Sequence, residues 1–152
     1  MSSKLQRIFV VVLNWNRSQD TIECLESVRE MKTNNYEIRT VIVDNASDAS
    51  SLGLIKKFIL NNPKIELIVN KVNLGYAAGN NIGIKNALTN GADYVLILNN
   101  DTYVHEELLL HLTKAIKLRK NSGVISPKIY FAPGFEFRKE RYSKNDLGRV
   151  IW

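Results

Sequence analysis

The chain has 152 residues, of which 45% are hydrophobic and 24% are charged, and it carries one cysteine. This composition excludes a disordered chain and favours a single globular domain, while the lone Cys24 excludes an internal disulfide and fits a reducing compartment. The net charge of +6 suits an anionic partner, but the lysines form no basic block, so nucleic acid is the weaker candidate. The sequence contains neither a signal peptide nor an apolar run of about 18 residues, which predicts a soluble, cytoplasmic chain.

Apolar periodicity predicts strands and helices in alternation, with Ser18 as the expected N-cap of the first helix. Alternation of this kind is typical of an α/β fold with a mostly parallel sheet and helices on both faces. The predicted strands are 8–13, 38–43, 65–69, 94–98 and 123–126, and the predicted helices are 18–31, one between Ser47 and Asn61, 76–88 and 105–118.

The third predicted helix is unusually rich in small residues. Glycine costs about 1 kcal/mol of helix propensity relative to alanine, so Gly79 and Gly83 predict a close approach to the sheet or to a ligand. Their spacing from Gly75 is four residues, which is a packing spacing and disfavours a Rossmann dinucleotide site.

Three predicted strands end in polar residues, at 14–16, 44–47 and 99–101. Because the carboxyl ends of parallel strands lie along one edge of a sheet, where ligands bind, we expect these three clusters to form one site.

The first candidate ligand is Asp101. A single carboxylate at a strand end can hold a divalent cation together with water and phosphate oxygens. Alternatively, Asp101 or Thr102 caps the following helix. The side chains of Asn99 and Asn100 could bind sugar hydroxyls or a metal-bound water, or they could be turn residues.

A second candidate is Asp44, whose carboxylate could accept a hydrogen bond from N3–H of uracil or thymine and so read a pyrimidine base. Capping of the next helix is an equally good interpretation, with Ser47 and Asp48 as rival caps. The segment 73–75 precedes a helix and could place backbone N–H groups near a phosphate.

The order of these segments is more specific than any one of them. Together, 13–16, 41–47, 73–83 and 96–101 resemble the nucleotide-sugar half of inverting family 2 glycosyltransferases over about residues 7–131. The resemblance is strongest to the rhamnosyltransferase-like branch, which is often involved in polysaccharide assembly. It implies a GT-A fold, a nucleotide-diphospho-sugar donor such as dTDP-rhamnose or a UDP-sugar, and a glycan or lipid-linked acceptor.

The same resemblance assigns residues. It implies that Asp44 reads the pyrimidine and that 99–101 stands at the Asp-x-Asp metal motif of the family, with Asn99 in place of its first carboxylate. Asp101 would then be the principal protein ligand of Mg²⁺ or Mn²⁺. With Asn99 and Asn100, the other positions expected near the nucleoside and diphosphate are Val12, Asn14, Asn73, Gly75 and Asn80.

The implied mechanism is a single displacement in which a carboxylate deprotonates the acceptor hydroxyl. We expect that base beyond Trp152, in an acceptor-binding half, with residues 1–132 forming the nucleotide-sugar-binding domain and 133–152 the start of a truncated acceptor region. The alternative is a non-catalytic or truncated nucleotide-sugar-binding domain. Peripheral contact with the inner face of a membrane and homo-oligomerisation stay open.

Overall fold

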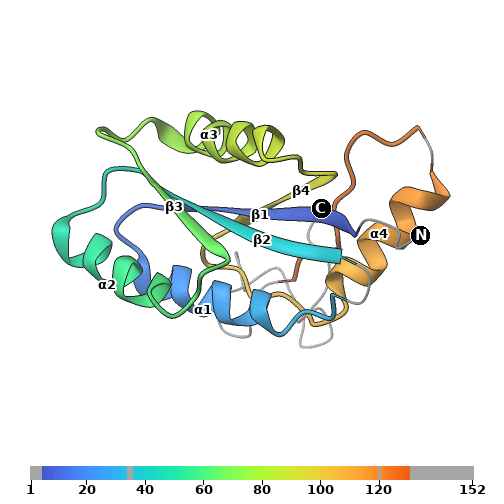
Figure 1. The fold of residues 1–152 in the computed structure, drawn as a ribbon, viewed down its shortest axis with the longest axis horizontal. Helices are drawn as coiled ribbons and strands as arrows, with labels where there is room; N and C mark the ends of the chain where they lie inside the picture. Colours follow the sequence, from blue (N-terminus) through green and yellow to red (C-terminus); the bar gives the residue numbers. More distant parts are fainter. Residues whose placement is uncertain (1–4, 34–35, 120, 131–152) are drawn as a thin grey trace, which may run out of the picture. The chain divides into compact units, whose positions relative to one another are not determined.

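A computed structural model describes residues 5–33, 36–119 and 121–130. The chain divides into two units, Met1–Leu110 and His111–Trp152, and the first contains the predicted site. The elements in chain order are β1 (Gln6–Asn14), α1 (Ser18–Arg29), β2 (Tyr36–Asp44), α2 (Ala49–Ile59), β3 (Ile65–Val69), α3 (Gly75–Thr89), β4 (Tyr94–Asn99) and α4 (Leu108–Leu118) (Figure 1).

The four strands form one parallel sheet in the order β3-β2-β1-β4. Strand β1 lies between β2 and β4 and is buried over most of its length, because an interior parallel strand is covered on both faces. Its side chains alternate between the two faces, with Ile8, Val10 and Val12 on one side and Phe9 and Val11 on the other.

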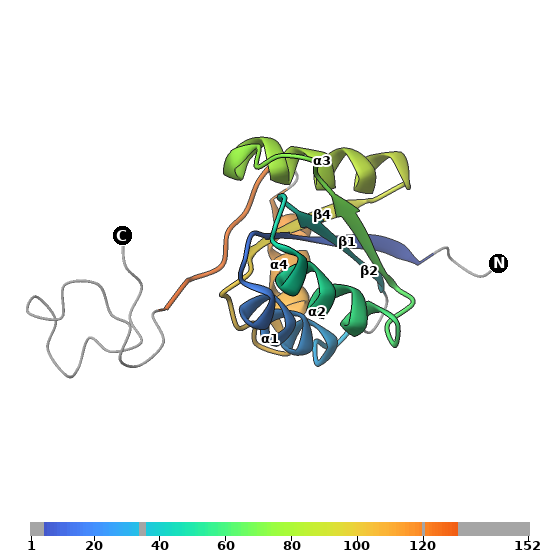
Figure 2. The same ribbon diagram turned by 90° about the vertical axis from the view of Figure 1, so that its left-hand side faces the viewer.

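Helices cover both faces of this sheet, as the alternating pattern predicts. Helices α1 and α2 lie on one face and α3 lies on the other (Figure 2). The cluster on the first face includes Leu25 and Val28 of α1 and Ile55 of α2, and the cluster on the second includes Ala87 of α3. Both clusters are built from the β-branched residues of β1 and β2, which suit a pleated, buried surface.

The glycines of α3 confirm the predicted close approach to the sheet. A Cβ atom at Gly79 would lie 2.5 Å from a terminal carbon of Leu13, and one at Gly83 would collide with Val11 and come within 3.1 Å of Val43. Helix α3 therefore lies on β1 and β2 at a distance that only a residue without a side chain allows.

One expected strand is absent. Residues 123–126 form no strand, and Val124 is 90% exposed; the run holds two large apolar residues between Gly123 and Pro127, too few to sustain a buried strand. The fourth helix, expected at about 105–118, is present at Leu108–Leu118.

Ser18 is not the N-cap of α1. It is the first helical residue, and Arg17 holds the capping position without a side-chain hydrogen bond. The chain leaves β1 through Asn16 in a left-handed conformation, φ 54°, and this reversal brings the backbone into helical geometry one residue earlier than the capping pattern suggests.

The proposed acceptor region at 133–152 lies outside the described residues. Within the part of the chain that the structure describes, no helix is long and apolar enough to cross a membrane.

Candidate functional site

The ends of β1, β2 and β4 meet, as predicted. In the parallel register Asn14 pairs with Asp44, and Leu13 pairs with Asn99. The three predicted polar clusters therefore lie side by side at the carboxyl edge of the sheet, with β1 in the middle.

Asp44 lies fully buried at the end of β2. Its Oδ2 accepts a hydrogen bond of 2.7 Å from Asn14 Nδ2, and its Oδ1 accepts one of 2.9 Å from the backbone N–H of Ser47. The capping interpretation of Asp44 is wrong, because Asp48 caps α2 by accepting a bond of 2.8 Å from Ser51 N–H. That bond is also the main cause of a lowered pKa of the Asp48 carboxyl.

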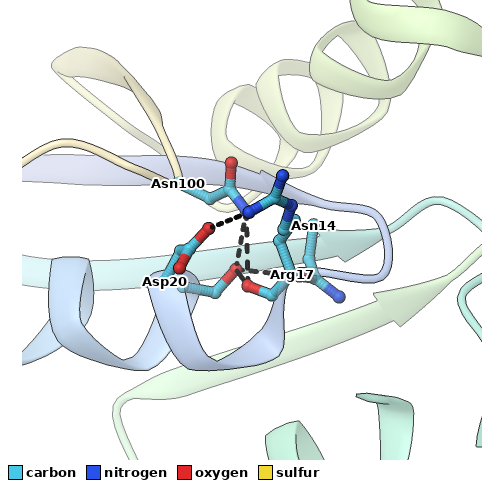
Figure 3. Close-up of polar contacts among 5 residues, drawn as sticks. Asn14, Arg17, Asp20 and Asn100 are labelled. Carbon is cyan, nitrogen blue, oxygen red and sulfur yellow. Dashed lines mark hydrogen bonds and ion pairs between the residues drawn. The ribbon is translucent and has the colours of Figure 1, made fainter. Parts of the chain in front are cut away.

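From Asn14 a chain of hydrogen bonds continues to the end of β4 (Figure 3). The hydroxyl of Thr21 donates to Asn14 Oδ1 at 2.8 Å, and Asn100 Nδ2 donates to the same hydroxyl at 3.1 Å. Asn14 and Thr21 are fully buried. Sequence reasoning missed Thr21; the only signal was a threonine one turn into a helix that follows a polar strand end.

Asn45 organises the loop between β3 and α3, and sequence reasoning missed it as well. Its Nδ2 donates to Asn73 Oδ1 at 2.7 Å and to the carbonyl of Gly75 at 3.3 Å, while its Oδ1 accepts from Asn70 Nδ2 and Leu74 N–H. Its place directly after Asp44 was the available signal.

The start of α3 lies beside these groups. Gly75 has φ 76°, a conformation that favours glycine, and its N–H donates to Asn73 Oδ1 at 2.8 Å. Asn80 is buried, and its Nδ2 donates to the Tyr76 carbonyl; its Oδ1 has no hydrogen-bond partner among the described residues. Val12, another predicted site residue, packs its side chain into the core, so only its backbone could reach a ligand.

The β4 end contacts the first turn of α3, since the hydroxyl of Tyr76 donates to Asn99 Oδ1 at 2.9 Å. Asp101 follows, exposed to solvent. Neither Asp101 nor Thr102 caps α4, which begins only at Leu108, so that alternative is wrong.

Asp101 presents a single exposed carboxylate for a metal ion. No group of three or more His, Cys, Asp or Glu side chains that could hold a metal occurs among the described residues. One carboxylate fits Mg²⁺ or Mn²⁺ only where phosphate oxygens and water complete the coordination.

Cys24 of α1 lies beneath the Asp101 loop, and its Sγ lies 3.6 Å from the Asn99 carbonyl oxygen. Burial raises the pKa of the Cys24 thiol to about 11, the Thr102 N–H lowers it in part, and the negative charge of Asp101 raises it further. This thiol is therefore protonated and unreactive in the folded chain at neutral pH.

We expect Cys24 in the folded chain to react with a disulfide reagent at pH 8 about a hundredfold more slowly than in the urea-unfolded chain. The folded state binds the thiol proton more tightly than the unfolded state does. The protonated Cys24 thiol therefore adds to the free energy of unfolding below the ordinary pKa of 9.0, and this addition is lost as the pH rises to about 11. Absorbance of the released thiolate, followed in native buffer and in urea, measures both rates. Equal rates would contradict the burial of this thiol.

Comparison with known proteins gives one family. The sequence model of the family described as "Glycosyl transferase family 2" matches residues 9–150. The chain is 25% identical over 123 residues to "Glycosyltransferase GlyG" of Streptococcus pneumoniae, a match that covers 81% of this chain and 39% of GlyG.

Solved structures show the same fold. Residues 1–349 of TarS from S. aureus superpose with a TM-score of 0.64 at 19% identity, over 84% of this chain and 40% of that TarS fragment, which has also been solved with UDP-GlcNAc. The mannosyltransferase PcManGT from Pyrobaculum calidifontis, solved with GDP-Man and Mn²⁺, gives a TM-score of 0.60 at 18% identity over 84% of this chain and 35% of that one. The predicted GT-A fold is thereby confirmed, and the chain spans about two fifths of the length of these relatives.

Proposed function

Because the chain belongs to glycosyl transferase family 2, we propose that it binds a nucleotide-diphospho-sugar and is the donor half of an inverting, metal-assisted glycosyltransferase. The proposed donor is dTDP-rhamnose or a UDP-sugar, as in the rhamnosyltransferase-like branch. The proposed acceptor is a glycan or a lipid-linked sugar on the cytoplasmic side of a membrane.

One contact carries this proposal: the hydrogen bond of 2.9 Å between Tyr76 and Asn99. It joins the first turn of α3, a helix of 15 residues without an acidic residue in that turn, to the loop that carries Asp101. Backbone N–H groups at a helix N-terminus attract phosphate, and a carboxylate attracts a divalent cation. A diphosphate placed between the two would satisfy both.

The residues of the chain have distinct roles in this proposal. Asp101 would hold the cation, the first turn of α3 would hold phosphate oxygens, and Gly75 allows the backbone to turn there. When bound, Mg²⁺ or Mn²⁺ would supply charge neutralisation for the departing diphosphate. The neighbours were solved with a uridine and a guanosine nucleotide-sugar, so the fold accommodates different bases.

Base recognition by Asp44 stays a prediction. The carboxylate is fully buried and both of its oxygens accept hydrogen bonds from the protein, so a base could reach it only after a local rearrangement. The burial instead supports a role in shaping the strand-end loops.

The test is calorimetric titration of UDP and dTDP with and without Mn²⁺. We expect the metal to raise the affinity by about tenfold or more, which corresponds to a binding free energy of about 1.4 kcal/mol or more. Asp101→Ala should remove this gain. Asp93→Ala is the matched control, because Asp93 lies just before β4, at the opposite end of that strand from Asp101. Equal affinities in both conditions for the unaltered chain would refute the metal assignment.

Transfer needs a separate measurement. We propose that the catalytic base lies beyond Trp152, in keeping with a chain that spans about two fifths of its relatives' length, so this chain binds the donor without transferring its sugar. Turnover by this chain at the rate of its longer relatives would contradict that proposal. Donor binding without transfer by any longer form would favour the alternative, a non-catalytic nucleotide-sugar-binding domain.

A further inference from the structure

We propose that Thr21 is a positioning residue for the nucleotide site: its hydroxyl couples the ends of β1 and β2 to the loop that presents Asp101. This inference rests on the proposed function for its ligand, and it names a residue of α1 that lies outside the metal and phosphate contacts.

The direction of each hydrogen bond in this relay is dictated by chemistry. The Nδ2 of Asn14 donates to Asp44 Oδ2 and to Ser47 Oγ, so the acceptor Oδ1 of the same amide faces Thr21. The Thr21 proton then goes to Asn14 Oδ1, and a lone pair of the hydroxyl accepts the amide proton of Asn100 at 3.1 Å. One carboxylate at the end of β2 is thus linked to the Asn100 amide beside Asp101, which also donates to the Arg17 carbonyl at 3.4 Å.

The face of α1 that carries Thr21 also contacts other residues of the loop 99–104. Cys24 lies against the carbonyl of Asn99, and Ser27 Oγ accepts a bond of 3.1 Å from Val104 N–H. Thr21, Cys24 and Ser27 are spaced three residues apart, so they lie along one side of the helix. All three are buried, which places three polar side chains of α1 under the loop 99–104.

A threonine whose hydroxyl bonded only within its own helix would not also contact Asn14 and Asn100. Thr21 could direct its hydroxyl to the Arg17 carbonyl, 3.0 Å away, but that carbonyl already accepts the Thr21 backbone N–H. Asn14 Oδ1, in contrast, is buried and has Thr21 as its donor. An unpaired buried acceptor is costly, so the hydroxyl is held in the relay.

The test compares Thr21→Val, which keeps the shape and removes the hydroxyl, with Thr21→Ser, which keeps the hydroxyl. Two readouts are used on the whole chain: hydrogen exchange of the amides in 100–104, and the ratio of dTDP affinities with and without Mn²⁺. In Thr21→Val we expect exchange to become about tenfold faster, because two hydrogen bonds are lost, and the affinity ratio to fall at least about fivefold. Thr21→Ser should keep both near the unaltered values.

Ile55→Val is the control for general destabilisation, because Ile55 lies in α2 within the core, and this change costs stability without touching the relay. It should leave both readouts unchanged. Unchanged exchange in Thr21→Val, an unchanged affinity ratio despite faster exchange, or equal effects of Ile55→Val would overturn the inference. If the unaltered chain shows no gain with Mn²⁺, the metal part of the proposed function fails, while the exchange data alone decide whether Thr21 positions the loop.

Discussion

Replacement of Asp44 by asparagine should destabilise the fold by about 2–4 kcal/mol. Both carboxylate oxygens accept hydrogen bonds, from Asn14 Nδ2 and from Ser47 N–H, and the side chain is fully buried. An amide offers one acceptor and one NH₂ group, so one of these donors would face another donor in a fully buried site. Each buried polar group left unpaired costs about 1–3 kcal/mol. Urea unfolding followed by circular dichroism measures the loss.

Asp48→Asn is the matched control for Asp44→Asn. It makes the same chemical change four residues later, at an exposed N-cap whose Oδ1 accepts from Ser51 N–H and from the Ser50 hydroxyl, and the amide oxygen of asparagine can accept both. Asparagine is as good an N-cap as aspartate, so its unfolding midpoint should stay close to that of the unaltered chain. If Asp44→Asn were equally harmless, the buried relay would not stabilise the fold. The preference of the Asp44→Asn variant for UDP over CDP, measured in parallel, tests whether Asp44 reads the base.

Replacement of Gly83 by alanine should also destabilise the chain, by about 1–3 kcal/mol, although alanine is the better helix former. The new methyl group would collide with Val11 and lie 3.1 Å from Val43. Both valines are fully buried in the middle of the sheet and are stiff at χ1, so they cannot turn away. Helix α3 would have to lift from the sheet, which would also displace its first turn and weaken nucleotide binding.

Gly53→Ala provides the opposite result in the same chain. Gly53 lies inside α2, and a Cβ atom there would meet nothing within 4 Å. The gain in helix propensity should therefore appear in full, as about 1 kcal/mol of added stability. Thermal unfolding of the two variants separates packing from propensity. Stabilisation by both substitutions would show that α3 does not need its close contact with the sheet.

The order of the elements could be predicted because local apolar patterns mark the first four strands and most of the helices. Strand β1 buries a continuous apolar run, and helix α1 buries an apolar stripe. Local patterns of this length predict the element that forms in the folded chain. The strand expected at 123–126 failed for the opposite reason. A short apolar run between glycine and proline carries no period, and a strand exists only where a partner supplies the hydrogen bonds.

Within the site, the sequence correctly indicated the carboxyl edge of the sheet, but it could not assign a role to each residue there. Asp44 has the same appearance in sequence whether it reads a base, caps a helix or holds a loop. The structure removes the cap, since Asp48 has that role, and shows both Asp44 oxygens engaged by the protein. Asn45 and Thr21 gave almost no signal, because their importance lies in partners that are 25–29 and 79 residues away in the chain.

By itself the sequence determined the α/β alternation, the position of Asp101 at the end of a strand and the small-residue face of α3. These depend on side-chain type and on spacing along the chain, which local physics converts directly into structure. Only the tertiary structure decided which strand ends are neighbours, which carboxylate is buried and which is exposed, and how Asn14, Thr21 and Asn100 connect. Hydrogen bonds between distant residues depend on atomic distances and directions, and these exist only once the helices have packed against the sheet.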